Sequence, residues 1–160
     1  MNLFRTVFAA ILAVGLSIVP ALAHSYKLGD LDIGHPFSKA MFVGAKVAGG
    51  YLKITNNGPV DDRLVRVSAS IGRVAQLHEM KMENDVMLMR ELPGGIEIPA
   101  GETVELAPGG LHIMFLDVAT PTKEGDKFKA VLTFERAGTI EVEFVVGSAK
   151  PDAQAHHHAK

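Results

Sequence analysis

Apolar and polar residues alternate in short runs along most of the chain, which predicts β-strands and not helices. The alternation is clearest over 51–55, where it meets a strong turn signal at Asn56-Asn57-Gly58-Pro59. No window of a dozen residues shows a convincing helical period. We therefore predict an all-β domain, a sandwich or barrel. Further strands are expected at 63–67, 73–78, 96–98, 103–106, 111–118, 127–135 and 139–146.

Residues 78–89 are expected to fold back on themselves as a hairpin. Asn84 and Asp85 both tolerate a positive φ and suit a two-residue turn. A turn there pairs Met82 with Met87 and Met80 with Met89. His78 then lies diagonal to Met89 on the same face, because strand side chains alternate.

The run 111–118 places a second set of candidate ligands on one face. His112 and Met114 are two residues apart, so on a strand they point the same way. We expect Leu111, Ile113 and Phe115 to point the other way, into the core.

The first 23 residues are predicted to be a secretory signal peptide. Arg5 is their only charge, an apolar run covers 7–19, and Ala21-Leu22-Ala23 forms a small-residue cleavage site. A membrane anchor is the alternative, but the apolar run is shorter than the roughly 20 residues that a spanning helix needs. This leaves a single domain at 24–147 and an expected flexible tail at 148–160.

The chain contains no cysteine, and this excludes several classes of site. Disulfides, thiolate zinc sites, iron–sulfur clusters, cysteine nucleophiles and the cysteine-ligated blue-copper centre all need a thiol. A net charge of −2 and a pI of about 6.4 lack the excess of positive charge that is typical of nucleic-acid-binding proteins. An exported domain without disulfides must be stabilised by its hydrophobic core alone.

Methionine is concentrated in the two segments described above, which hold five of the seven methionines. Together with His78 and His112 they offer neutral thioethers and imidazoles. Such soft, uncharged donors favour Cu(I). Zinc seldom takes thioether ligands, and calcium and magnesium need oxygen.

Two other interpretations remain open from the residues alone. The methionines could be core filler or an adaptable protein-binding surface that holds no metal. Alternatively, cleavage after Ala23 would make His24 the first residue, and its amine and imidazole could chelate Cu(II) in a copper enzyme.

At these residues the sequence resembles the periplasmic copper(I) chaperones of the PCuAC family. The spacing is a His, ten residues, a Met, a spacer of about twenty, and a His-x-Met, as in His78, Met89, His112 and Met114. The resemblance extends over 24–147. It includes His35-Pro36, Gly49-Gly50-Tyr51, Asn56-Asn57-Gly58, the run 95–101 and Pro108-Gly109-Gly110.

The resemblance implies a cupredoxin-like Greek-key β-sandwich that binds one Cu(I) through His78, Met89, His112 and Met114. It implies a carrier and not an enzyme, delivering copper toward the CuA centre in cytochrome c oxidase subunit II or to another copper chaperone. We expect the mature protein to be a monomer that does not span the membrane.

The remaining candidates match no ligand position of that family. We expect Met82 and Met87 to pack or to contact a partner, with Met80 nearer to the site. Weak Cu(II) binding is an expectation for the tail histidines His156, His157 and His158.

Overall fold

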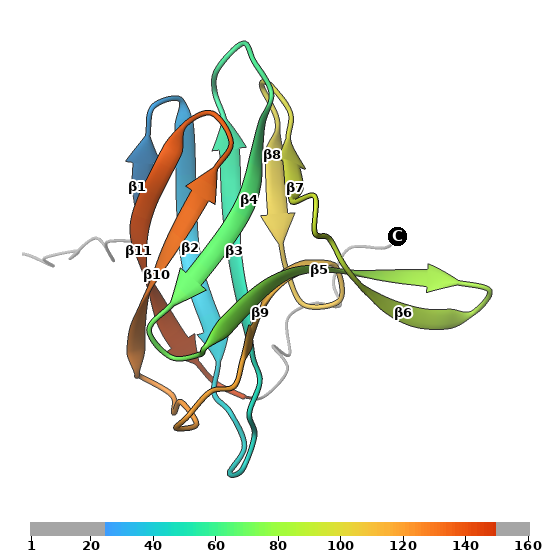
Figure 1. Cartoon of the computed structure of the whole chain (residues 1–160), viewed down its shortest axis with the longest axis vertical. Coiled ribbons are helices and arrows are strands. Elements are labelled where there is room, and N and C mark those ends of the chain that lie inside the picture. The colour runs from blue at the N-terminus through green and yellow to red at the C-terminus, as the bar shows by residue number, and fades with distance from the viewer. Residues whose placement is uncertain (1–24, 150–160) are drawn as a thin grey trace, which may run out of the picture.

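The computed structural model describes residues 25–149, and this part of the chain consists of strands joined by turns and loops (Figure 1). Within it no helix is long and apolar enough to cross a membrane. The strands are β1 Ser25–Leu28, β2 Leu31–Lys39, β3 Ala48–Asn56, β4 Asp62–Ala69, β5 Val74–Glu83, β6 Val86–Glu91, β7 Ile96–Ile98, β8 Thr103–Leu106, β9 Leu111–Leu116, β10 Lys127–Phe134 and β11 Gly138–Gly147.

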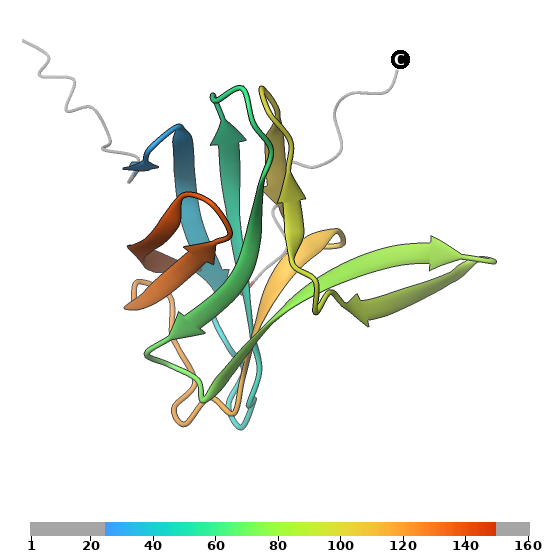
Figure 2. The ribbon, with the colours of Figure 1, turned by 45° about the horizontal axis from the view of Figure 1, so that its top comes forward.

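The strands form one continuous hydrogen-bonded path that folds over itself. Its order is β6-β5-β9-β3-β2-β11-β10-β4-β7, with β1 added to β2 and β8 added to β3. Neighbours are antiparallel except β2 and β11, which run parallel. The β5–β6 hairpin extends away from the body of the sandwich in both views (Figures 1 and 2).

Three phenylalanine rings join the two layers of the sandwich. Phe115 of β9 meets Phe128 of β10 and Phe144 of β11 edge-on, with ring centroids 5.3 and 5.7 Å apart. Phe128 and Phe144 stack at 5.2 Å. Gly50 of β3 must lack a side chain here, because a Cβ would lie 2.7 Å from the Phe115 ring. Burial of these large rings stabilises the packing of β9 against β10 and β11.

The prediction of an all-β sandwich is confirmed, and every strand expected from the sequence is present within a few residues. The pattern missed β1 and β2. Strand β2 is interrupted at Gly34–Phe37 by a register shift, and His35 there has a φ of 54°. This irregularity breaks the alternation that sequence reading relies on. The predicted signal peptide at 1–23, and residues 150–160 of the predicted tail, lie outside the described residues.

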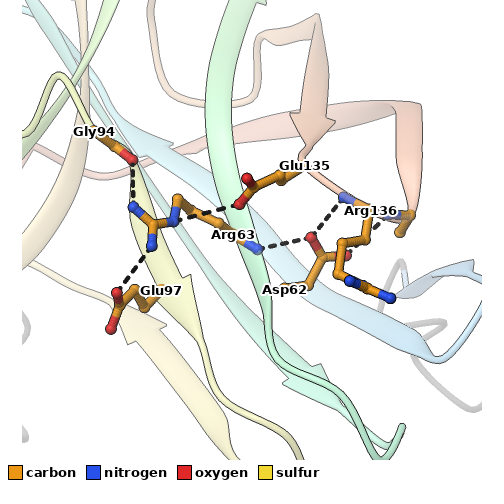
Figure 3. A network of polar contacts seen from close by, with 7 residues as sticks. Asp62, Arg63, Gly94, Glu97, Glu135 and Arg136 are labelled. Atoms are coloured by element: carbon orange, nitrogen blue, oxygen red, sulfur yellow. Dashed lines mark hydrogen bonds and ion pairs between the residues drawn. The ribbon is translucent and has the colours of Figure 1, made fainter.

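A polar network closes the end of the sandwich that is formed by β4, β7 and the β10–β11 turn (Figure 3). Asp62 is 8% exposed, and its carboxylate accepts hydrogen bonds from the backbone N–H groups of Arg63, Arg136 and Ala137 at 2.7, 2.9 and 3.0 Å. The neighbouring Arg63 guanidinium pairs with Glu97 at 3.0 Å and with Glu135 at 3.5 Å. The buried carboxylate therefore holds the turn against β4.

Replacing Asp62 tests this role. We expect Asp62→Ala to lower the free energy of unfolding by about 2–4 kcal/mol, because three backbone N–H groups lose a charged acceptor. Asp62→Asn keeps one carbonyl oxygen and should lower the free energy of unfolding by a smaller amount. Urea denaturation measures both. A loss under about 0.5 kcal/mol for the alanine variant would contradict the assignment.

Candidate metal centre

The four predicted ligands lie on three neighbouring strands, β6, β5 and β9. Strand β5 is in the middle, and His78 pairs directly with His112 across the β5–β9 ladder. Their ring centroids are 5.7 Å apart with the planes tilted by 40°. The sequence indicated that both histidines belong to one site, but it did not predict that they are cross-strand partners.

The β5–β6 hairpin has the predicted register. Asn84 and Asp85 have φ values of 49° and 61° and form the turn. Met80 pairs with Met89. Since His78 pairs with Glu91, Met89 lies diagonal to His78, and the predicted geometry is confirmed.

Strand β9 has the predicted orientation as well. Ile113 and Phe115 are fully buried in the core, while Leu111 is only partly buried against it. His112 and Met114 therefore face the other side of the sheet. Met114 pairs with Gln76 of β5 and with Gly49 of β3. The structure thus brings His78, Met89, His112 and Met114 to one face, which is the predicted clustering.

A hydrogen bond fixes the tautomer of His112. Its Nδ1 lies 2.9 Å from the carbonyl oxygen of Gly110. A carbonyl can only accept, so Nδ1 carries the proton and Nε2 keeps its lone pair. Backbone support of this kind is typical of metal-binding histidines.

Gln76 performs the same function for His78. The Gln76 Oε1 lies 3.0 Å from His78 Nε2, so Nε2–H donates and Nδ1 keeps its lone pair. His78 Nδ1 is buried and has no hydrogen-bond partner. A buried acceptor without a partner costs free energy unless it binds something. This nitrogen fits a metal ion. No pattern in the sequence indicated the role of Gln76.

The environment of His78 favours the neutral ring. Burial lowers the pKa of His78 below 6.5, and the nearby His112 lowers it further, while Glu91 across the hairpin acts in the opposite direction. Only the neutral imidazole offers a lone pair to a metal. The ring of His78 is therefore mainly neutral at neutral pH, and its Nδ1 keeps a lone pair.

Tyr51 covers the β3 side of this face. Gly49 lies opposite Met114, and a Cβ at Gly49 would collide with the Tyr51 hydroxyl. Burial raises the pKa of Tyr51, so its phenol stays protonated and uncharged at neutral pH. Glycine at position 49 thus allows an aromatic ring to lie beside Met114.

The donor set is made of two imidazoles and thioethers. Across residues 25–149, no three His, Asp or Glu side chains are grouped closely enough to hold a metal ion. In this part of the chain, the nearby methionines are the donors that could add to His78 and His112 on the same face. Burial is uneven, since His112 is 8% exposed and Met89 is 52% exposed. His24, His156, His157 and His158 lie outside the described residues.

Comparison with known sequences gives a lipoprotein family and one relative. The family model described as "Putative lipoprotein LpqE-like" matches residues 31–146. A protein named "Putative lipoprotein Lxx21020", from Leifsonia xyli subsp. xyli, is 32% identical over 147 residues, covering 88% of this chain and 87% of the relative.

Comparison with solved structures gives PCuAC domains. The copper-bound PCuAC domain from PmoF2 matches with a TM-score of 0.68 and 27% identity, over 78% of this chain and 98% of that domain. The apo PCuAC domain from PmoF1 matches at 0.67 and 28%, over 78% and 99%. Apo-DR1885 from Deinococcus radiodurans shares the fold at 0.59 and 17% identity, over 91% and 97%. The predicted cupredoxin-like fold is confirmed.

The assigned tautomers can be measured in the metal-free protein. Long-range ¹H–¹⁵N NMR should show unprotonated nitrogen at His78 Nδ1 and His112 Nε2, because Gln76 and Gly110 hold the opposite nitrogens. Over a pH series, the ring of His78 should titrate below 6.5. Gln76→Leu removes one acceptor and should change the tautomer ratio of His78 only. Unchanged His78 signals in that variant would show that Gln76 does not set the tautomer.

Proposed function

The chain belongs to the LpqE-like family, and from this premise we propose that it is an exported copper chaperone that carries one Cu(I). The ligands are His78, Met89, His112 and Met114. One observation supports this above all others. The register pairs two histidines whose free nitrogens are both unprotonated, with two methionines on the same face.

The charge of the donor set supports Cu(I) over other ions. All four ligands are neutral, so they compensate none of the charge of a divalent ion and suit a singly charged one. Thioether sulfur is a soft donor that selects Cu(I), whose filled d shell accepts a tetrahedral arrangement. The copper-bound PCuAC domain from PmoF2 has this fold and adds independent support.

The uneven burial of the site suits a carrier. His112 is anchored on a central strand, whereas Met89 is half exposed on β6 at the edge of the sheet. A partner's ligand can reach the ion from the Met89 side before the histidines release it. Copper is therefore cargo in this proposal, and the protein's residues hold it without chemical transformation.

Two alternative functions require different properties of the protein. A copper enzyme would need His24 at the mature N-terminus, and mass spectrometry of the exported protein tests this directly. A metal-free interaction module is compatible with the exposed methionines, but it gives no reason for two cross-strand histidines that each keep one ring nitrogen free of hydrogen bonds to Gln76 or Gly110. The copper carrier accounts for both features.

Export is proposed from the signal-like segment 1–23 and agrees with the lipoprotein names of the family and the relative. The sequence contains no cysteine, so it offers no thiol to carry a thioether-linked lipid. We propose a periplasmic protein that is released by cleavage after Ala23. An exported protein that retains residues 1–23 on mass analysis would contradict the release.

Anaerobic titration with Cu(I), in competition with a chromophoric chelator, tests the site. The wild-type protein should bind one equivalent. We expect Met89→Leu, Met114→Leu, His78→Gln and His112→Asn each to weaken binding by about 100-fold or more. Leucine keeps the volume without the thioether, and each amide can keep the hydrogen bond that its histidine makes.

Met41→Leu is the matched control, because this methionine lies outside the two site segments. Its affinity should equal that of the wild type. One-to-one binding at wild-type affinity in all four ligand variants would overturn the proposed site.

We propose that the carrier delivers its Cu(I) to the CuA domain of cytochrome c oxidase subunit II or to another copper chaperone. Mixing the Cu(I)-loaded protein with a metal-free soluble CuA domain should transfer copper at a rate that rises with acceptor concentration. Direct handover is bimolecular, whereas prior release into solution is not. Copper content of the separated proteins measures the transfer, and a rate independent of the acceptor would exclude handover.

A further inference from the structure

Met82 and Met87 form a pair that the proposed ligand set does not use. They are direct cross-strand partners in the β5–β6 hairpin. Their exposures are 57% and 47%, so they do not pack within the domain, and of the two expected roles only contact with a partner stays a prediction. Only the Glu83–Val86 pair separates them from the Asn84-Asp85 turn at the tip of the hairpin. This hairpin extends away from the sandwich (Figure 2).

This pair shares its face with the proposed copper site. Met82, Met80 and His78 are two residues apart along β5, so their side chains point to the same side. Met87 and Met89 repeat this on β6. Two directly opposed methionine pairs therefore lead along the hairpin to the histidine pair. Successive pairs are about 7 Å apart, since each residue of a strand advances roughly 3.4 Å.

The geometry allows each pair to hold one ion. Directly opposed Cβ atoms lie about 4.5–5.5 Å apart in an antiparallel pair. Methionine is unbranched with three rotatable bonds, so two opposed sulfurs can converge on one centre. The outer pair offers only two neutral thioethers in a solvent-exposed position, which makes for weak binding and rapid exchange.

We propose that Met82 and Met87 form an outer Cu(I) capture site, from which the ion passes by way of Met80 and Met89 to His78 and His112. The inference rests on the proposed function, because it gives the entry route to that site. Each step exchanges one neutral ligand for another, and copper stays Cu(I) throughout. No proton has to leave, since both receiving nitrogens already carry free lone pairs.

NMR of [methyl-¹³C]methionine-labelled protein, titrated with Ag(I), tests the outer site. Silver is a redox-stable ion with the same charge and a filled d shell. The first equivalent should shift the methyl signals of Met89 and Met114. Further Ag(I) should shift Met82 and Met87 in a separate, weaker phase. No response of Met82 and Met87 at any ratio would overturn the capture site.

The two proposals fail in different ways in this titration. If Met89 and Met114 do not respond to the first equivalent, the proposed function fails. If they respond and the outer pair does not, only the capture site fails.

Loading kinetics test the route with a variant that keeps the apolar surface. We expect Met82→Leu/Met87→Leu to retain the wild-type affinity for the first Cu(I) and to load several-fold more slowly from a Cu(I)–acetonitrile complex in anaerobic stopped flow. The control is Leu88→Ala, which removes an exposed apolar side chain from the opposite face of the hairpin. It should load at the wild-type rate.

Wild-type loading by the double leucine variant would show that copper enters elsewhere. Equal slowing by Leu88→Ala would also contradict the route, because it would trace the effect to the hairpin and not to the thioethers.

Discussion

The proposed copper site depends on the way β9 is anchored in the core. Ile113 and Phe115 are fully buried, and Phe115 lies edge-on to Phe128 and Phe144 from the other layer. Because side chains alternate, this packing directs His112 and Met114 to the opposite face. A slip of one residue would exchange the two sets and bury an imidazole among aromatic rings, so the core enforces the orientation of the ligands.

Two adjacent glycines on β3 leave room for aromatic rings on opposite faces of the sheet. Gly50 leaves room for the Phe115 ring on the core side, and Gly49 leaves room for Tyr51 beside Met114 on the site side. A side chain at position 50 would disturb the packing that anchors β9. One at position 49 would displace the ring that borders the proposed site. The packing of the core and the border of the proposed site therefore both depend on the absence of side chains at Gly49-Gly50.

Local features of the site could be predicted from the sequence, whereas its long-range features could not. The hairpin register follows from the turn at Asn84-Asp85 and the orientation of β9 from its own alternation, and both are confirmed. The direct pairing of His78 with His112 depends on where β5 docks along β9, and no local pattern encodes that register. The hydrogen bonds of His78 to Gln76 and of His112 to Gly110 could not be predicted either. They depend on where the ring nitrogens and the acceptor oxygens lie in the folded structure.

A copper carrier has to hold its ion firmly and still release it quickly, and the layout of the strands offers a way to meet both demands. His112 is held by the Gly110 carbonyl on a strand paired on both sides. Met89 belongs to β6, an edge strand that pairs only with β5 and is exposed along its whole length. Displacing Met89 disturbs neither the core nor the histidine hydrogen bonds. In the proposed carrier, exchange that begins at Met89 can therefore proceed while the imidazoles keep the ion in place, and tight binding need not imply slow transfer.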